Sequence, residues 1–366
     1  MNDARPVALI TGEVSPYRRE PFRRLAEVEI VEIVEWGDQP AADAPDSGPP
    51  VHRTTQAGAA RLVAEGRYRA VICGLGGRIA LPAAYAAARR ARVPFVLWAS
   101  VWAHPRSAAH ALSVIPTRFL YRHADAVITY GPHVSAHVAR ARGVRGGLFE
   151  APQAVDVEHF GAEVEPARRR AARERAGVAD PDGFLALFVG RLVPEKGVEV
   201  LLEAWRLAQP RLGPGAALVL AGDGPLRSAV EAAGPGVRAL GALAREDLPA
   251  LYAAADVLVL PSIRTATFLE PWGLVINEAM LQETPVIAST AVGAAAGVLV
   301  RHEMNGLVVP QRDSRALAEG LFIMSNDPQR RRELGVAARQ EALAYDAQAW
   351  VDGVRRALRS VSASRP

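Results

Sequence analysis

The chain has 366 residues, of which 50% are hydrophobic and 22% are charged, and this composition excludes an intrinsically disordered protein. Its length exceeds what one hydrophobic core usually supports, so we expect two domains. The single cysteine, Cys73, excludes an internal disulfide and a metal cluster held by several thiolates.

The formal net charge of +4 is accompanied by a concentration of arginines in the first half of the chain. A solvated surface accounts for such arginines, and contact with an anionic membrane or a negatively charged substrate stays open as an alternative. The sequence has no basic stripe interleaved with aromatic residues, so we expect no nucleic-acid partner. It shows no signal-peptide pattern and no apolar run of the ~20 residues that span a bilayer. We therefore expect a cytoplasmic protein, with peripheral contact at the inner membrane face as the alternative, and leave the oligomeric state open.

Strands alternate with helices along the first part of the chain. Short apolar runs predict strands, and the amphipathic or alanine-rich stretches between them predict helices. The predicted strands are 7–10, 29–36, 70–73, 94–100 and 126–129. The predicted helices pass through 22–25, 59–65, 83–92 and 134–142, with an amphipathic stretch at 119–121 and a loop at 37–51. This alternation indicates a parallel sheet covered by helices on both faces.

The pattern lapses between residues 152 and 182, where an arginine-rich helix, 166–176, ends at Gly177 before a turn at 180–183. We place the domain boundary in this segment. A second alternation follows, so the predicted architecture is α/β with two doubly wound domains. Its strands are 185–189, 217–221, 238–240, 257–260, 285–288 and 306–309. Its helices are 198–208, 225–233, 245–254 and 314–324, and a helical tail, 328–360, breaks near Tyr345.

Two carboxylates eight positions apart, Glu270 and Glu278, follow the predicted strand 257–260. A helix that begins near Gly273 would hold Glu278 more than a turn inside and leave Glu270 in the loop ahead of it. Both would then lie at different depths of one cleft at the carboxyl end of a strand, where open α/β sheets place ligands. The alternative is a loop glutamate and a solvated helix glutamate.

Two cations occupy one strand-to-helix loop at the start of the second alternation, where Gly190 and Arg191 are followed by Lys196 and Gly197. Fixed cations beside the N–H groups of a helix N-terminus form a diphosphate site. Arginine grips phosphate with two parallel bonds, and lysine supplies a mobile point charge. Two solvated surface cations are the alternative. A further strand-end turn, 222–225, has mainly structural value.

These motifs occur in the order seen in retaining glycosyltransferases of the GT-B fold. The second domain resembles the large family that includes sucrose synthases and bacterial mannosyl- and glucosyltransferases, whereas the first domain is similar only in its strand order and in Ser15-Pro16-Tyr17-Arg18. The motifs that carry the resemblance are 190–197, 222–225, 260–262, 270–278, 285–288 and 305–309.

The resemblance implies two Rossmann-like domains that face each other across a cleft. Residues 1–160 would bind the acceptor, through the loops 11–19, 37–51, 74–78 and 100–107, and residues 161–345 would bind the nucleotide sugar. The final helix, 346–366, would pack back on the first domain. The reaction implied is transfer of a hexose, with retained configuration, from a nucleoside-diphosphate sugar to a hydroxyl. A uridine nucleotide is expected first and a guanosine nucleotide second, and the acceptor is a glycan, a lipid-linked sugar or a secondary metabolite.

The resemblance also assigns roles to residues. Arg191 and Lys196 would stabilise the departing diphosphate, Glu270 would bond the donor sugar, and Glu278 would bond the ribose. The resemblance implies no cofactor, since the nucleoside-diphosphate sugar is the donor substrate. The catalytic candidates are Glu270, Arg191, Lys196 and His104. The donor-binding candidates are Gly12, Gly190, Arg191, Lys196, Gly273, Leu274 and Glu278.

Some positions depart from the family pattern. Many members carry a histidine directly after the strand that corresponds to 95–99, where this chain has Ser100. His104 is therefore the candidate, with an ordinary loop histidine as the alternative. Residues 291–297 replace the family's glycine pair and glutamate, and 264–269 lengthen the lead into Glu270.

A metal site is not expected. Glycosyltransferases of the other main fold hold a divalent ion with an Asp-x-Asp pair that follows a strand. The only such triplet here, Asp180-Pro181-Asp182, lies in a turn ahead of a strand.

The main alternative function is a nicotinamide- or flavin-dependent oxidoreductase, because two doubly wound domains also suit it and Gly74-Leu75-Gly76-Gly77 follows a strand. That run lacks the full dinucleotide fingerprint and its acidic partner. A nucleotide-sugar epimerase, a phosphorylase and a non-catalytic sugar-nucleotide sensor are further alternatives.

Overall fold

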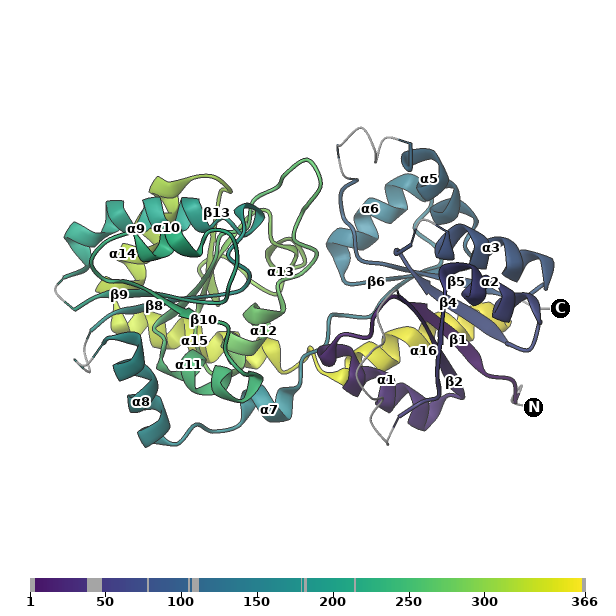
Figure 1. Cartoon of the computed structure of the whole chain (residues 1–366), viewed down its shortest axis with the longest axis horizontal. Coiled ribbons are helices and arrows are strands. Elements are labelled where there is room, and N and C mark those ends of the chain that lie inside the picture. The colour runs from purple at the N-terminus through teal and green to yellow at the C-terminus, as the bar shows by residue number, and fades with distance from the viewer. Residues whose placement is uncertain are drawn as a thin grey trace. The chain divides into compact units, whose positions relative to one another are not determined.

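The computed structural model describes residues 4–37, 48–77, 79–104, 106, 112–178, 180, 183–213 and 215–363 (Figure 1). Most of the predicted loop 37–51, together with Arg78, most of 105–107, Pro181 and Asp182, lies outside the described residues. The chain divides into two compact units. Unit 1 comprises Met1–Ala154 and Asp346–Pro366, and unit 2 comprises Val155–Tyr345.

Unit 1 is built on a parallel sheet whose described strands follow the order β3-β2-β1-β4-β5-β6-β7. Its first strand is central and lies in register with a neighbour on each side, since Val7 pairs with Val31 and with Ala70. Aliphatic residues bury both faces of the central strands. The strands are β1 (Val7–Thr11), β2 (Val31–Trp36), β3 (Val51–Thr54), β4 (Ala70–Gly74), β5 (Phe95–Ala99), β6 (Ala126–Thr129) and β7 (Leu148–Glu150).

Helices cover both faces of this sheet because right-handed crossovers to the left and to the right of β1 return on opposite sides. On one face α1 (Pro16–Val28) packs against α16 (Ala347–Ala363), and the ring of Trp350 lies 5.6 Å from those of Phe22 and Trp98. The other face carries a row of helices in pairwise contact (Figure 1). These helices are α2 (Gln56–Ala64), α3 (Ala80–Arg90), α5 (Val114–His123) and α6 (Pro132–Arg142).

Unit 2 has a second parallel sheet, whose described strands follow the order β10-β9-β8-β11-β12-β13. Every residue of β8, β9, β11 and β12 is buried, as expected for a sheet covered on both faces. The strands are β8 (Leu185–Val189), β9 (Ala217–Ala221), β10 (Val237–Gly241), β11 (Val257–Leu260), β12 (Val286–Ser289) and β13 (Gly306–Val309).

The helices of unit 2 also form two layers. On one face α9 (Val198–Leu212) packs against α14 (Ser314–Asn326) (Figure 1), and α10 (Arg227–Glu231) packs against β10. On the other face successive contacts join a group of helices. These are α7 (Val157–Gly161), α8 (Pro166–Ala176), α11 (Leu248–Ala254), α12 (Leu274–Leu281) and α15 (Pro328–Ala342). Three short elements complete the unit: η1 (Pro194–Lys196), η2 (Arg245–Asp247) and α13 (Gly293–Ala296).

The predicted fold class, α/β with two doubly wound parallel sheets, is confirmed. The prediction missed the two edge strands of unit 1, β3 and β7. The residues of β3 are alternately exposed and half-buried, and β7 has only three residues. Edge strands bury little apolar surface, so their sequences carry a weak pattern.

The strand order reverses beside the first strand of each sheet, between β1 and β4 in unit 1 and between β8 and β11 in unit 2. Loops on either side of such a point leave in opposite directions and open a crevice at the carboxyl ends of the strands. Each unit therefore offers one place at which its fold favours a ligand.

Candidate functional site

The carboxyl ends of β8, β9 and β11 in unit 2 are brought together by glycines. A Cβ added at Gly222, after β9, would overlap the carbonyl oxygen of Gly190, after β8. A Cβ added at Gly197 would overlap the carbonyl oxygen of Pro261, after β11, and Gly197 has a left-handed φ of +72°. Because glycine has no Cβ, the backbones of these loops can lie in direct contact. The loops that follow β8, β9 and β11, which carry the motifs noted in the sequence, therefore meet at one edge of the sheet.

Lys196 and Glu270 form the centre of this site. Lys196 ends the η1 turn after β8, and its Nζ lies 2.5 Å from Oε2 of Glu270, in the loop after β11. Both side chains are largely shielded from solvent, with 16% and 8% exposed. Lys196 is also the only lysine of the chain, because the other 42 of its 43 Lys and Arg residues are arginines. The structure thus joins two predicted site residues that lie 74 positions apart.

A buried serine fixes the carboxylate of Glu270. The Oγ of Ser262 donates a hydrogen bond to Glu270 Oε2 over 3.1 Å, and the Oγ of Ser289, at the end of β12, donates to the carbonyl oxygen of Ser262. Both serines are buried. Glu270 Oε2 therefore faces a cation and a hydroxyl that are held from two neighbouring strands.

The residues that lengthen the lead into Glu270 have a structural role. A turn closes between Thr265 and Phe268, in which the Phe268 N–H donates to Thr265 Oγ1 over 3.0 Å. The turn places the Phe268 ring with its centroid 5.7 Å from Lys196 Nζ. An aromatic face attracts an ammonium group at this range. Phe268 is thus a further residue in contact with Lys196, and the sequence pattern around Phe268 did not predict this contact.

The loop after β12 packs against the backbone of Glu270. Val292 forms a parallel bridge with Glu270, and the Gly293 N–H donates to the Glu270 carbonyl oxygen over 3.0 Å. A Cβ added at Gly293 would overlap the carbonyl oxygen of Pro271. The segment 291–297, which departs from the family pattern, therefore supports the site by direct contact.

Arg191 is placed differently from Lys196. Its side chain is 66% exposed, and its guanidinium lies 3.5 Å from Glu195 in the same loop. Gly190, which precedes it, donates its N–H to the carbonyl oxygen of Ala221 and so ties the loop to β9. The structure thus puts Arg191 on the loop of Lys196, with most of its side chain exposed to solvent.

Glu278 lies more than one turn inside α12, as predicted. Gly273 precedes this helix with a φ of +97°, Leu274 is its first residue, and no side chain caps its N–H groups. The hydroxyl of the buried Tyr252, on α11, donates to Glu278 Oε2 over 2.6 Å. Burial raises the pKa of Glu278 to about 7, although the Tyr252 hydrogen bond and the charge of Arg245 act in the opposite direction.

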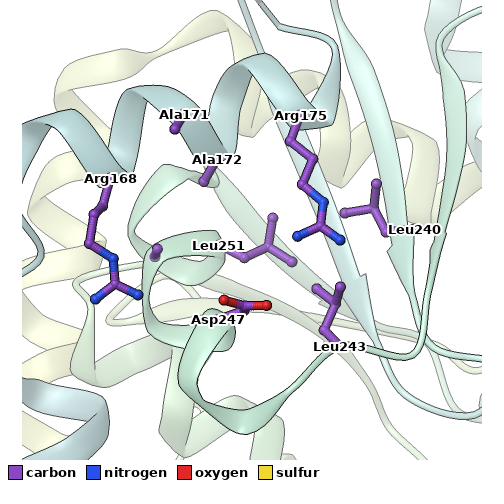
Figure 2. A pocket seen from close by; sticks show the side chains of 9 residues that line it. Arg168, Ala171, Ala172, Arg175, Leu240, Leu243, Asp247 and Leu251 are labelled. Carbon is purple, nitrogen blue, oxygen red and sulfur yellow. The ribbon is translucent and has the colours of Figure 1, made fainter.

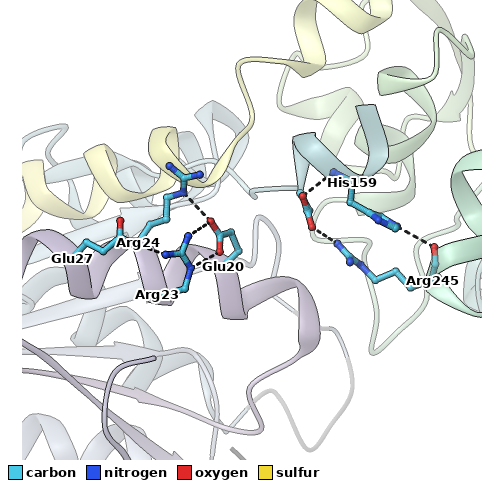
Figure 3. Close-up of polar contacts among 7 residues, drawn as sticks. Glu20, Arg23, Arg24, Glu27, His159 and Arg245 are labelled. Atoms are coloured by element: carbon cyan, nitrogen blue, oxygen red, sulfur yellow. Dashed lines mark hydrogen bonds and ion pairs between the residues drawn. The ribbon is translucent and has the colours of Figure 1, made fainter. Parts of the chain in front are cut away.

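Arg245 belongs to a polar cluster of unit 2 that joins α7 to η2 (Figure 3). Its Nη2 lies 2.6 Å from Asp156 Oδ2, and its carbonyl oxygen is 3.2 Å from His159 Nε2. Asp156 also accepts from the His159 N–H and caps α7. Figure 3 also draws a separate cluster on α1 of unit 1, where Glu20 accepts from Arg23 and Arg24. From the sequence, Arg23 and Arg24 were noted only among the arginines concentrated in the first half of the chain, and the cluster around Arg245 was not noted.

The aromatic residue between the two glutamates is part of the core. Trp272 is 2% exposed, and its Nε1 donates to Asn277 Oδ1 over 2.8 Å. Its ring centroid lies 5.5 Å from that of Tyr345. Trp272 and Asn277 therefore set the path of the chain between Glu270 and Glu278.

In unit 1 the structure separates the two predicted residues. Gly12 lines a cavity of about 200 Å³ at the ends of β1, β4, β5 and β6, and Ser100 lines the same cavity. His104 lines another cavity of about 250 Å³, between α5 and α6, where its Nε2 is 3.4 Å from Ser113 Oγ. Ser100 rather than His104 thus shares the cavity of Gly12.

A groove of about 200 Å³ lies beside α8 in unit 2 (Figure 2). Figure 2 shows Arg168 and Arg175 reaching from α8 on either side of Asp247, with leucine side chains next to them. None of the predicted site residues lines it. The groove is therefore a feature separate from the contact between Lys196 and Glu270.

The described residues offer neither a metal site nor a membrane-spanning helix. They contain no group of three or more His, Cys, Asp or Glu side chains arranged to hold a metal ion. None of the helices built from them combines the length and apolar character of a membrane span.

Comparison with known proteins places this site in a family. The model of the family "Glycosyl transferases group 1" matches residues 170–341, which lie within unit 2. An uncharacterized glycosyltransferase of Methanocaldococcus jannaschii is 37% identical over 161 residues, which are 42% of this chain and 39% of that protein. A GDP-mannose-dependent alpha-(1-6)-phosphatidylinositol monomannoside mannosyltransferase of Mycolicibacterium smegmatis is 32% identical over 228 residues, which are 60% and 58%. The chain thus spans less than two thirds of the length of either relative.

A solved structure extends the likeness in fold to nearly the whole chain. Anabaena HepE in complex with UDP aligns with a TM-score of 0.77 and 24% identity over 97% of this chain and 100% of HepE. The chain therefore has the GT-B fold, and residues 170–341 of its unit 2 match the model of the glycosyl transferases group 1 family.

Proposed function

We propose that the protein transfers a hexose, with retained anomeric configuration, from a nucleoside-diphosphate sugar bound by unit 2 to a hydroxyl of an acceptor bound by unit 1. The observation that carries the proposal is the ion pair of Lys196 and Glu270, largely shielded from solvent, at the carboxyl ends of β8 and β11. The family match covers this part of the chain.

Lys196 and Arg191 would hold the diphosphate of the donor. Both lie on the loop that leads from β8 to α9, and α12 begins beside the same strand ends without a capping side chain or an acidic residue in its first turn. Uncapped helix N-termini attract phosphate through their N–H groups and the helix dipole. Fixed cations stabilise the charge that develops on a departing diphosphate, so we expect transfer to persist in EDTA.

Glu270 would accept hydrogen bonds from the hydroxyls of the donor sugar. Without ligand, its carboxylate is engaged by Lys196, and each charge lowers the cost of burying the other. A diphosphate would draw the flexible Lys196 ammonium away and release Glu270 Oε2 for the sugar. The acceptor would then attack on the face that the nucleotide leaves, and the departing phosphate would take the hydroxyl proton.

Glu278 would hold the ribose. An ionised carboxylate accepts hydrogen bonds from two neighbouring hydroxyls, and the 2.6 Å bond from Tyr252 fixes the orientation of this one. His104 is kept as a candidate near the donor sugar, although Ser100 lines the cavity of Gly12. Replacing each in turn decides between them, because only a residue near the sugar should lower transfer without affecting nucleotide affinity.

The base of the nucleotide is proposed from two relatives. HepE was crystallised with UDP, and the mannosyltransferase of Mycolicibacterium smegmatis is named for its dependence on GDP-mannose. We propose UDP first and GDP second. An oxidoreductase is not supported by the family match or by these relatives. In addition, Cβ atoms added at Gly76 and Gly77 would lie 3.2 and 3.0 Å from Trp36, so the indole crowds this glycine turn.

Peripheral membrane contact belongs to the proposal if the acceptor is lipid-linked. The segment around the start of α5 exposes Leu112 and Ile115, and the exposed Arg118 follows Ile115 by three positions on the same helix. Exposed apolar residues beside cations suit an anionic bilayer surface. Co-sedimentation with phosphatidylglycerol vesicles, but not with phosphatidylcholine vesicles, is the expected result.

The proposal is tested by ligand-dependent unfolding and by one substitution. UDP or GDP should raise the unfolding temperature and NAD should not, since a ligand at 100 times its Kd stabilises by about 2.7 kcal/mol. Glu270→Gln should lower transfer at least ~100-fold while UDP affinity holds or rises, because Lys196 loses a competing carboxylate. Glu203→Gln, on the exposed surface of α9, is the control. Full transfer by Glu270→Gln, or a shift with NAD alone, would refute the proposal.

A further inference from the structure

The cavity at the strand ends of unit 1 contains a cation for which the proposed donor site has no use. It has a volume of about 200 Å³ and lies where the strand order reverses between β1 and β4. Its lining combines two indoles, small residues and one guanidinium. The lining residues are Thr11, Gly12, Arg18, Trp36, Gly74, Leu75, Gly76, Trp98, Ser100 and Tyr130.

Arg18 is held in this cavity by neutral groups. Its Nη1 donates to Thr11 Oγ1 over 3.0 Å, and its Nη2 lies 3.3 Å from the Tyr130 hydroxyl. The guanidinium also lies over the Trp98 ring, 4.8 Å from its centroid. Its Nε is buried without a hydrogen-bond partner in the described part of the chain. Arg18 is therefore held in a defined orientation, with N–H groups left to donate.

The charge of Arg18 is not neutralised. Among the described residues it forms no ion pair, whereas Arg67 and Arg69, in the same unit, lie against Glu32 and Glu29. Burial raises the pKa of Tyr130, so this phenol stays neutral and supplies no negative charge. Arg18 is partly buried, and charges that are shielded from solvent are normally paired, because desolvation of a lone charge costs free energy.

The carboxylate at the end of β2 does not fill this role. Glu35 accepts from the Val14 N–H over 2.7 Å and from Arg53 Nε over 3.3 Å. Both of its oxygens are thus engaged, and they fix the loop that leads to α1. An external anion is the group that would complete the environment of Arg18.

The size and lining of the cavity indicate what such an anion is attached to. A volume of about 200 Å³ is below the ~300–1,000 Å³ of pockets that enclose drug-sized ligands. It suits a single charged group with part of one sugar ring. The planar guanidinium fork matches a carboxylate or a phosphate, and the indoles of Trp36 and Trp98 supply apolar walls.

We propose that Arg18 recognises a negatively charged substituent, a carboxylate or a phosphate, on a sugar acceptor, and that the cavity between β1 and β4 is the subsite for that group. The assignment to an acceptor depends on the proposed function, because unit 2 is there assigned to the donor, and it replaces the donor-binding role that the resemblance implies for Gly12, which lines the same cavity. The anion site itself depends only on the geometry of unit 1.

Calorimetric titration of the full chain with D-glucuronate, D-glucose 6-phosphate and D-glucose tests the proposal. At least one anionic sugar should bind, with glucose at least tenfold weaker, and the preferred one distinguishes carboxylate from phosphate. Arg18→Gln should weaken its binding at least tenfold, as expected for loss of a charge-assisted hydrogen bond. Arg19→Gln is the matched control, since Arg19 follows on α1, is exposed and lines no part of the cavity. UDP affinity should be unchanged in both.

A second variant keeps the test decisive if Arg18→Gln does not fold. Arg18→Lys retains the charge but not the fork, and its affinity for the anionic sugar should fall between those of the native chain and Arg18→Gln. Equal binding of glucose, equal effects at Arg18 and Arg19, or no binding of either anionic sugar would overturn the proposal. Loss of UDP affinity in Arg18→Gln would assign the cavity to the donor. A native chain that binds the anionic sugar but neither UDP nor GDP would refute the proposed function and leave the anion site intact.

Discussion

Unit 1 and unit 2 have the same order over six strands, and each has its own ligand-favouring crevice, but they differ in what lies against the partly buried cation of each. In unit 2 the ammonium of Lys196 lies against the carboxylate of Glu270. In unit 1 the guanidinium of Arg18 lies against hydroxyls and an indole. The same fold thus presents a neutral pair at one site and an uncompensated charge at the other.

The difference indicates how each site would respond to a ligand. A paired lysine can exchange its carboxylate for a phosphate by rotating a flexible side chain, so the site changes state when it is filled. A stacked arginine is already oriented, so its site gains a charge partner without rearrangement. Unit 2 is suited to a group that departs during a reaction, and unit 1 to a group that stays bound.

Removal of the cations of unit 2 is expected to have the largest effect. The double variant Arg191→Ala, Lys196→Ala should lower sugar transfer at least ~1,000-fold, because the leaving diphosphate loses its stabilising charges. Arg206→Ala is the control, since Arg206 is 69% exposed on the neighbouring helix α9. Steady-state transfer with a UDP-sugar measures the effect. If the double variant keeps its rate, the cations of unit 2 do not stabilise a departing diphosphate, and the proposed difference between the two units is wrong.

Crowding the loops of unit 2 should be the next largest perturbation. Gly197→Ala places a Cβ against the Pro261 carbonyl, so we expect the free energy of unfolding to fall by roughly 2–4 kcal/mol. Nucleotide affinity should fall as well, because the loop that carries Lys196 is displaced. Gly143→Ala, in unit 1, has a similar left-handed conformation but no atom within 4 Å of the added Cβ. It should cost only about 1–2 kcal/mol. Equal losses in chemical denaturation would show that conformation, not loop contact, dominates.

A smaller effect sharpens the comparison within unit 2. Unlike Glu270, Glu278 has no ion-pair partner among the described residues, and its pKa is raised to about 7. Because the folded chain has the higher carboxyl pKa, ionisation of Glu278 opposes folding. The loss of stability begins as the pH rises past the unfolded pKa near 4.5 and is complete above the folded pKa of about 7. Glu278→Gln, which can still accept from Tyr252, should therefore raise the unfolding temperature by a few degrees at pH 8 and by much less at pH 5.

The same variant should bind UDP more weakly, because a neutral amide accepts fewer hydroxyl hydrogen bonds than a carboxylate. Glu231→Gln, at an exposed carboxylate of α10, is the control and should change neither quantity by more than about 0.5 kcal/mol. Unfolding temperatures at the two pH values test the claim. A Glu278→Gln stabilisation that does not vary with pH would contradict it.

The strands and helices could largely be predicted because their patterns are local. The bounds of β8, β9, β11 and β13 follow from short apolar runs ended by glycine, proline or charged residues. The strand β3 could not be predicted in this way, because its residues are partly exposed and its extended conformation depends on pairing with β2. Its register, Val51 against Ile33, is a tertiary contact without a local signature.

The site was predictable in its members but not in its contacts. Lys196 and Glu270 stood out by motif, yet their contact requires that β11 lie next to β8, which sheet topology alone decides. Ser262 was visible only as part of a strand end, and nothing in its helix marked Tyr252 as a partner of Glu278. Arg18 was one of a cluster of arginines, and only burial separates it from Arg19.

The scarcity of lysine gives the site of unit 2 an experimental consequence. Every other basic side chain of the Lys/Arg set is an arginine, so an amine-reactive reagent finds a single ε-amino target, and that target lies between Glu270 and the Phe268 ring. Any molecule that draws Lys196 into a new salt bridge will change the rate of its acylation. The extent of labelling at one peptide can thus report occupancy of the Lys196 site in an unfractionated mixture.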